Sequence, residues 1–275
     1  MRIKVSNLLL LAVPLIVLFL FVTRNNLLKS SVNMLRNRFI NGKTLTGESQ
    51  SQGVSLKYRY FEPGTKSGSP LLVILHGAGE RGSDNRKQLD YGTIMFIKEI
   101  RKKYSPLILL PQCPSDNAWT INPRRPFNNF SLDSIPASKT LEVVRGIILK
   151  LVKEYQVDTN RLYIIGYSMG GTGTWEMILR NPGLFAAAIP VSAASDPSKA
   201  ALLKDVHIWA FSSESDQIYD YRETEETVKA LIANNIDVKH TLYQNRGHNI
   251  YELVLKDAEV PEWLFSQRKS ENLPE

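Results

Sequence analysis

A serine flanked by glycines is the clearest chemical signal in this sequence. The segment Gly166-Tyr167-Ser168-Met169-Gly170 has the pattern G-x-S-x-G and directly follows the apolar run Leu162–Ile165. In that context the serine occupies a tight turn from a strand into a helix, which exposes its hydroxyl group. The positions two residues away from the serine have almost no room for a side chain, which explains the glycines. The pattern therefore predicts a nucleophile at Ser168.

A serine hydroxyl is a poor nucleophile until a neighbouring base takes its proton, and histidine is the usual base. Of the four histidines, His207 and His240 lie within predicted strands, and His76 precedes the serine. Hydrolases with this serine turn have the chain order serine, acid, histidine. Only His248, which follows a predicted strand near the end of the chain, fits that order, so we predict it to be the general base.

The acid that orients the histidine should follow a strand between Ser168 and His248. Asp216 comes after the predicted strand Val206–Phe211 and a short polar loop, and Glu214 in the same loop is its nearest rival. Two further acids are less well placed: Asp196 and Asp220. We predict that Asp216 holds the imidazole tautomer and stabilises the imidazolium, without taking the proton itself.

An acyl-transfer site also needs two amide donors for the oxyanion. The amide of Met169, at the start of the predicted helix, is one candidate. The second donor should come from the loop after the predicted strand Leu71–Leu75, where Ala78 is preferred over Gly79.

The same loop matches the dinucleotide fingerprint, through Gly77, Gly79 and Gly82. No clear helix begins at Gly82, and the next strand, Leu107–Leu110, ends without an acid that could bind a ribose. The serine constellation therefore explains the loop better than a nucleotide site. The sequence also contains neither a phosphate-loop lysine nor a cluster of metal ligands.

Apolar strands alternate with helical patterns after residue 53. The predicted strands are Ser55–Phe61, Leu71–Leu75, Leu107–Leu110, Arg161–Ile165, Phe185–Val191, Val206–Phe211 and Val238–Tyr243; the predicted helices are Thr140–Tyr155, a helix after Ser168 to about Arg180, Glu223–Ala233 and helices from Tyr251 onward. This alternation predicts an α/β fold with a mostly parallel central sheet and helices on both faces. Ligands of such sheets bind at the carboxyl ends of the strands, and the candidate residues follow strands.

The N-terminal segment differs from the rest of the chain. Residues 1–47 contain seven basic residues and no acid, and removing these seven from the 34 basic residues leaves 27, equal to the number of acids. The remainder is therefore neutral, which argues against a nucleic-acid surface. Residues 8–22 carry no charge and no cleavage site follows them, which favours an uncleaved signal anchor over a cleaved signal peptide.

These features divide the chain into four parts. Residues 1–23 are predicted to form a hydrophobic membrane helix and residues 24–53 a basic juxtamembrane linker, with 54–268 as the catalytic domain and 269–275 as a C-terminal tail. We expect the protein to be membrane-anchored by its N-terminal segment, or exported. Basic residues flank both ends of the apolar run, so the side of the membrane stays open. The single cysteine, Cys113, forms no intramolecular disulfide and is expected to be buried.

Three motifs together resemble a known group. His76–Gly82 after Leu75, Pro111–Pro114 with Trp119, and Gly166–Gly171 with Gly173-Thr174-Trp175 are similar to the α/β-hydrolase serine esterases, in the dienelactone-hydrolase and polyhydroxybutyrate-depolymerase-like branch. The resemblance extends from about Val54 to Gln267. It implies a sheet of about eight strands, acyl-enzyme chemistry and no cofactor.

The chain departs from that group at Ser212-Ser213, where many members have His-Gly, and at Asn249-Ile250 after the histidine. The short stretch 192–205 leaves no room for a large cap domain. Residues 115–138, which include Arg124, Arg125 and Phe127, are expected to form a wall or flap of an open cleft. Substrate contacts are predicted for Gly79, Trp119 and Tyr167.

These observations predict a serine esterase that acts on small-molecule or polymeric esters. Two alternatives stay open: a serine peptidase of the same fold, and a catalytically silent, membrane-tethered binding module. The sequence does not decide the acyl and alcohol groups or the oligomeric state.

Overall fold

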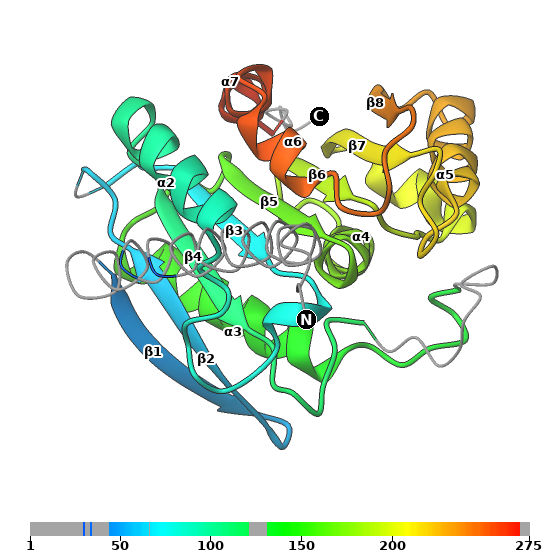
Figure 1. The fold of residues 1–275 in the computed structure, drawn as a ribbon. Helices are drawn as coiled ribbons and strands as arrows, with labels where there is room; N and C mark the ends of the chain where they lie inside the picture. Colours follow the sequence, from blue (N-terminus) through cyan, green and yellow to red (C-terminus); the bar gives the residue numbers. More distant parts are fainter. Residues whose placement is uncertain (1–29, 31–33, 35–43, 66, 121–130, 270–275) are drawn as a thin grey trace, which may run out of the picture. The chain divides into compact units, whose positions relative to one another are not determined.

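The computed structural model describes residues 30, 34, 44–65, 67–120 and 131–269. The chain divides into two compact units, Met1–Gly42 and Lys43–Glu275. All strands β1–β8 and the helices that cover them belong to the second unit (Figure 1).

The second unit is built on one sheet of eight strands, in the order β1-β2-β4-β3-β5-β6-β7-β8. The strands are β1 (Leu45–Ser51), β2 (Val54–Phe61), β3 (Leu71–Leu75), β4 (Leu107–Gln112), β5 (Leu162–Tyr167), β6 (Ala187–Val191), β7 (His207–Ser213) and β8 (Val238–Tyr243). The β1–β2 and β2–β4 pairs are antiparallel, and the other pairs are parallel. The predicted mostly parallel sheet of about eight strands is thus confirmed.

Helices cover both faces of this sheet. They are α2 (Tyr91–Lys103), α3 (Lys139–Glu154), α4 (Met169–Arg180), α5 (Tyr221–Ala233), α6 (Tyr251–Lys256) and α7 (Glu259–Ser266), with the 3-10 helices η1 (Ala78–Glu80) and η2 (Pro197–Leu203). Helices α3, α4 and α5 pack on one face, in a common core with alternate residues of the strands. Helix α7 packs on the other face, where Trp263 meets Trp209 of β7, and α2 contacts α6.

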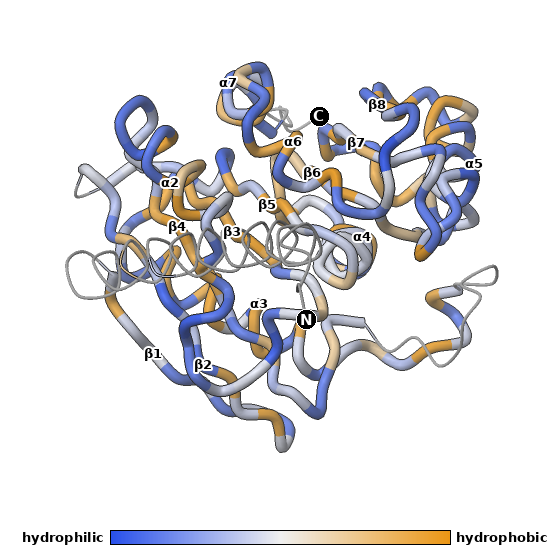
Figure 2. The backbone as a smooth tube through the Cα atoms, in the orientation of Figure 1, coloured by the Kyte–Doolittle hydropathy of each residue, from blue (hydrophilic) through white to orange (hydrophobic). Residues whose placement is uncertain are grey.

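The central strands are apolar along their whole length because both of their faces are covered. All five residues of β3 are buried, and so are all six of β4. Figure 2 shows the hydrophobic residues concentrated in β3, β4 and β5. In the β3–β5 ladder Leu75 pairs with Gly166, so the loop after β3 and the turn after β5 leave the sheet side by side.

Strand β1 corrects the predicted linker, which covered residues 24–53. Residues Leu45–Ser51 instead pair with β2 along their whole length, from Leu45–Tyr60 to Ser51–Val54. The compact unit accordingly begins at Lys43, ahead of the predicted boundary at Val54. Strand β1 is at the edge of the sheet and mostly exposed. Its composition is therefore polar, like that of a linker.

The predicted N-terminal helix, residues 1–23, lies outside the described residues, and so do residues 270–275 of the predicted tail. In the described part of the chain, no helix has both the length and the apolar character needed to cross a membrane. Membrane attachment stays a prediction. The connection between β6 and β7, where a cap domain was not expected, holds the 3-10 helix η2.

Candidate active site

Ser168 occupies the turn between β5 and α4, as the sequence predicts. Its backbone angles, φ 54° and ψ −117°, lie in a region that non-glycine residues rarely adopt, at a cost on the order of 1–3 kcal/mol. Its amide donates to the carbonyl of Val191 at the end of β6, at 2.8 Å. The turn is thereby fixed to the neighbouring strand.

The glycines on either side of Ser168 are required by close backbone contacts. A Cβ atom on Gly166 would lie closer than 3.0 Å to the carbonyl of Gly170, and one on Gly170 closer than 3.0 Å to the carbonyl oxygens of Leu75 and His76. Gly170 therefore brings the start of α4 directly against the end of β3.

We expect Gly170→Ala to lower the free energy of unfolding by about 3 kcal/mol, because its new methyl group meets backbone atoms that cannot rotate away. Gly146→Ala is the matched control. That position lies in the middle of α3 with nothing within 4 Å of the added Cβ, so a gain of about 0.5–1 kcal/mol is expected there. Urea unfolding of both variants measures the difference, and equal effects would contradict the close approach at Gly170.

His248 joins Ser168 to Asp216 through two hydrogen bonds. Its Nε2 lies 2.8 Å from Ser168 Oγ, and its Nδ1 lies 2.8 Å from Asp216 Oδ2. A carboxylate only accepts, so Nδ1 carries the proton and Nε2 is left to accept from the serine hydroxyl. The Asp216 side chain is 2% exposed and that of His248 is 19% exposed. The imidazole is thus in the tautomer that can take a proton from Ser168.

The backbone around Asp216 orients its carboxylate. Oδ1 accepts the amides of Ile218 at 2.7 Å and Tyr219 at 3.1 Å, which leaves Oδ2 for His248. Glu214, the rival acid from the sequence, is exposed, and its amide donates to the carbonyl of Tyr243. The structure therefore brings Asp216 to the histidine.

Two serine hydroxyls that the sequence did not single out as functional hold the loop of His248. Ser192, immediately after β6, donates to the carbonyl of His248 at 3.1 Å. Ser213, the last residue of β7, donates to the carbonyl of Arg246. The departure from the similar esterases at Ser213 thus has a structural use, because its hydroxyl group ties the histidine loop to the sheet.

Aromatic rings pack beside the imidazole. The rings of Tyr167 and Tyr219 lie 5.2 and 5.8 Å from that of His248, at interplanar angles of 34° and 20°. Tyr251 stacks on Tyr167 at 5.2 Å. Burial raises the pKa of Tyr167 to about 12, with a further contribution from the negative charges of Asp216 and Glu80. Tyr167, a predicted substrate contact, is therefore a neutral phenol packed against the base.

The other histidines are engaged elsewhere. His240 Nε2 lies 2.8 Å from the hydroxyl of Ser212, but that serine is 2% exposed and cannot meet a substrate. His207 Nε2 lies 3.3 Å from the carbonyl of Arg268. Neither lies on a strand beside β5: His207 is on β7, beyond β6, and His240 is on β8, beyond β6 and β7.

His76 is a buried structural residue. Its Nδ1 lies 2.6 Å from the Gly77 carbonyl, and its Nε2 accepts the amide of Cys113 at 3.0 Å. Its own carbonyl accepts the indole N–H of Trp119 at 2.9 Å. These bonds fix the loop after β3 to the end of β4. Burial of the ring lowers the pKa of His76 from 6.5 to about 4.

This shift predicts a loss of stability in mild acid. The unfolded chain takes up the His76 proton near pH 6.5 and the folded chain only near pH 4, so the stabilisation is complete above pH 6.5 and is lost as the pH falls toward 4. The loss is about 3 kcal/mol at most. In urea titrations at pH 7, 6, 5 and 4, His76→Gln should have a shallower pH dependence than wild type. The matched variant at partly exposed His207, His207→Gln, should retain the wild-type slope; a His76→Gln slope equal to wild type would contradict the prediction.

The two predicted oxyanion donors lie on neighbouring segments. Met169 is the first residue of α4, whose first amides have no carbonyl partner within the helix. Ala78 begins η1, and both Ala78 and Gly79 are exposed. Because Gly170 packs on the carbonyls of Leu75 and His76, the start of α4 and the loop that carries Ala78 meet at the end of β3.

Trp119 corrects a predicted substrate contact. Its side chain is 0% exposed, and a Cβ on Gly173 would lie 2.6 Å from the Trp119 Cβ. The ring also packs edge-on against His76, with centroids 5.0 Å apart. Trp119 therefore packs against the loop after β3 and stabilises it from the protein interior. Gly79, in contrast, is exposed with open space beside it, and its contact with substrate stays a prediction.

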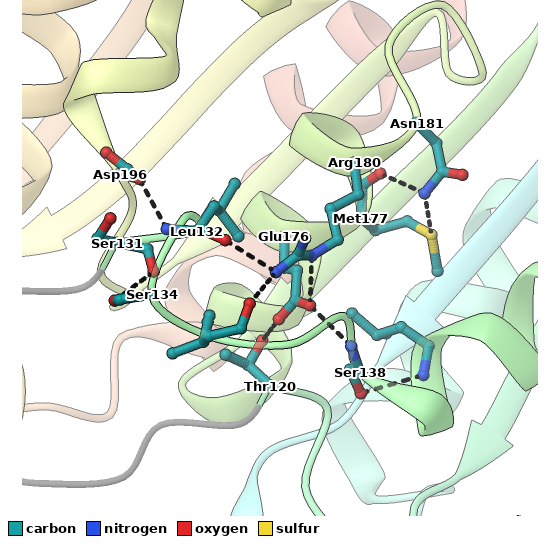
Figure 3. Close-up of polar contacts among 12 residues, drawn as sticks. Thr120, Ser131, Leu132, Ser134, Ser138, Glu176, Met177, Arg180, Asn181 and Asp196 are labelled. Carbon is teal, nitrogen blue, oxygen red and sulfur yellow. Dashed lines mark hydrogen bonds and ion pairs between the residues drawn. The ribbon is translucent and has the colours of Figure 1, made fainter.

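A buried carboxylate anchors the described ends of the predicted wall. Glu176 of α4, with 0% exposure, accepts from the hydroxyl of Thr120 at 2.7 Å and from the amide of Ser138 at 3.1 Å (Figure 3). Arg180 pairs with Glu176 at 2.9 Å and donates to the carbonyl of Ile135. The predicted wall residues Arg124, Arg125 and Phe127 lie outside the described residues.

No group of three or more His, Cys, Asp and Glu side chains that could hold a metal ion occurs in the described part of the chain. Of the glycines of the dinucleotide fingerprint, Gly79 lies in the 3-10 helix η1, Gly77 precedes it and Gly82 follows it, and the next α-helix begins only at Tyr91. The Gly82 amide donates to the carbonyl of Cys113 at 2.9 Å. That loop therefore connects the end of β3 to the end of β4 by hydrogen bonds.

The sheet order and the serine at the turn between β5 and α4 define an α/β-hydrolase fold. Residues 129–253 match the dienelactone hydrolase family, which confirms the resemblance read from the sequence motifs. The chain is similar to the crystal structure of a thermostable esterase, with a TM-score of 0.75 and 34% identity, over 82% of this chain and 64% of that one. A ferulic acid esterase matches with a TM-score of 0.62 and 17% identity, over 82% of this chain and 98% of its own.

Among curated proteins, the chain is 24% identical over 188 residues to a bifunctional acetylxylan esterase/xylanase of Neocallimastix patriciarum. The match covers 68% of this chain and 25% of that enzyme. The chain therefore spans about a quarter of that relative and less than two thirds of the thermostable esterase.

Proposed function

We propose that the chain is a serine hydrolase that cleaves carboxylic esters by way of an acyl-enzyme on Ser168. The observation that supports this most strongly is the continuous line of hydrogen bonds from Ser168 through His248 to Asp216, with both distances at 2.8 Å. A serine, a histidine in the accepting tautomer and a buried carboxylate are the parts that activate a hydroxyl nucleophile.

In the first half-reaction Ser168 Oγ forms a bond to the ester carbonyl carbon while its proton passes to His248 Nε2. The imidazolium is stabilised by Asp216, which stays ionised. The negative oxygen of the tetrahedral intermediate accepts hydrogen bonds from the amides of Met169 and Ala78, and the positive end of α4 adds to that stabilisation. When the intermediate collapses, the carbon–oxygen bond to the alcohol breaks and the alcohol leaves with the proton from His248.

In the second half-reaction water replaces the alcohol. His248 Nε2 takes a proton from the water as the water oxygen attacks the acyl carbon, and Ser168 Oγ recovers that proton when the acid leaves. The proton of Ser168 thus leaves with the alcohol and is replaced by a proton from water, so the enzyme ends in its starting state.

An ester is proposed over a peptide because two relatives are named esterases, the thermostable esterase at 34% identity and the acetylxylan esterase/xylanase at 24%, whereas the similar dipeptidyl peptidases are only 15–16% identical. The substrate is a small-molecule or polymeric ester. A serine peptidase and a catalytically silent fold are the alternatives that the experiment must separate.

The test is turnover by the full chain of p-nitrophenyl esters of increasing acyl length, with the matching p-nitroanilides in parallel. Ester turnover that greatly exceeds anilide turnover supports the proposal. An optimum in acyl length would show how long an acyl chain the site accommodates. Comparable turnover of the anilides would favour the peptidase. Folded protein that hydrolyses neither class would favour the silent fold.

A further inference from the structure

Tyr219 contacts Asp216 and His248 directly and is connected to Ser168 through Thr172. It follows Asp216 by three residues and is 7% exposed. Its amide donates to Asp216 Oδ1 at 3.1 Å, and its ring lies 5.8 Å from that of His248 at an angle of 20°. Its hydroxyl accepts from Thr172 Oγ1 at 3.3 Å.

The contact with Thr172 connects Tyr219 to the nucleophile. Thr172 lies one turn into α4, and its amide donates to the carbonyl of Ser168 at 3.0 Å. Through this pair the tyrosine is fixed to the helix that begins directly after Ser168. One side chain therefore links the loop of the acid to the helix of the nucleophile, with the base packed against its ring.

The hydrogen bonds to His248 leave one motion unrestrained. Both bonds end on ring nitrogens, Nδ1 and Nε2, so tilting the imidazole about the line through those atoms changes neither distance. That tilt is resisted by the attachment of the ring to Cβ and by packing against the ring faces. Nearly parallel aromatic rings supply such packing with a defined geometry.

We propose that Tyr219 is a positioning residue of the active site. Its ring sets the tilt of the His248 ring by stacking, and its amide and hydroxyl hold the Asp216 carboxylate and the start of α4 in place beside that ring. This inference rests on the proposed function. Because Tyr219 is buried, it does not contact the substrate. A residue that acts only through His248 is expected to change kcat and to leave KM unchanged.

The test compares Tyr219→Leu, Tyr219→Met and Tyr219→Phe in ester hydrolysis. The first two variants lose the flat ring and should lower kcat by about tenfold with KM within about twofold of wild type, because small misplacements of a catalytic group are costly. Tyr219→Phe keeps the ring and the amide bond, so its kcat should stay within about threefold. Two ring-free variants are used so that failure of one to fold leaves the other.

Tyr60→Leu is the matched control. It also removes a ring-to-ring contact, between Tyr60 and Tyr155 at 6.0 Å, but on β2, which is separated from β5 by β4 and β3. Its melting temperature should fall while kcat stays at the wild-type value. Wild-type kcat in folded Tyr219→Leu or Tyr219→Met would overturn the proposal. So would a raised KM at unchanged kcat, or a loss in Tyr219→Phe equal to that in Tyr219→Leu.

A second readout does not depend on turnover. The proton on His248 Nδ1, hydrogen-bonded to Asp216, is expected as a far-downfield proton resonance in the wild type and in Tyr219→Phe, and to broaden in the two ring-free variants. An equally sharp resonance in all four proteins would overturn the positioning role. If the wild type hydrolyses no ester, the proposed function fails, and this resonance still decides whether Tyr219 orders His248.

Discussion

Replacing Ser168 by alanine is expected to lower kcat for ester hydrolysis by about 10⁴-fold or more, by analogy with other serine triads. The variant keeps His248 and Asp216 but has no oxygen that can attack the ester carbonyl. Its KM should change little, because Ser168 contributes chemistry more than binding. Steady-state kinetics on the best p-nitrophenyl ester measure the loss.

Ser212→Ala is the matched control for that variant. It removes the hydroxyl of the serine–histidine pair between β7 and the edge strand β8, where the oxygen of buried Ser212 lies 2.8 Å from His240 Nε2. We expect wild-type kcat in Ser212→Ala, with a loss of stability of about 1 kcal/mol from the broken hydrogen bond. Equal losses of activity in the two variants would contradict the assignment of Ser168.

Asp216→Asn is expected to lower kcat by about 10⁴-fold, as the corresponding change does in a serine protease. An asparagine can still accept the amides of Ile218 and Tyr219 through its oxygen. Its amide group, however, donates to His248 Nδ1, which moves the imidazole proton to Nε2. The histidine then offers a donor to Ser168 where an acceptor is needed.

Glu214→Gln provides the comparison within the same loop. Its side chain is exposed and the described contact of Glu214 is made by its backbone amide. We expect its kcat within about twofold of wild type, since an exposed side chain away from the reacting atoms has little effect. A large loss in Glu214→Gln with activity retained in Asp216→Asn would reverse the choice of acid.

The parts of the fold that the sequence could predict are those with a local signal. Strands β3 and β4 are short apolar runs, and the serine turn follows directly from its glycines and the strand before them. The choice of His248 also needed no structure, because chain order excluded His76 and the predicted strands accounted for His207 and His240.

Other features depend on contacts between distant segments. The sequence favoured Asp216 but kept Glu214 as a rival, and the turn in which the Asp216 amide donates to the carbonyl of Ser213 decides which side chain turns inward. Trp119 was predicted to contact substrate because the residues around it in the sequence do not indicate that it is buried against Gly173 of α4.

Strand β1 and helix α2 were not predicted, for two different reasons. The outer edge strand β1 is polar and so resembles a linker. Helix α2 begins at an Asp90 cap, whose carboxylate accepts from the amide of Thr93 at 2.8 Å, but its early Gly92 and clustered β-branched residues weaken the helical pattern. The supporting hydroxyls of Ser192 and Ser213 were missed because their carbonyl partners lie in a loop more than 30 residues away.

The most direct test of the account is covalent labelling of the full chain by a fluorophosphonate, with the modified peptide identified by mass spectrometry. An activated Ser168 should take up one phosphonyl group per chain, with loss of ester turnover in proportion, and Ser168→Ala should take up none. Folded wild-type protein that is not labelled, or that is labelled at a different serine, would contradict the account of Ser168 as the nucleophile.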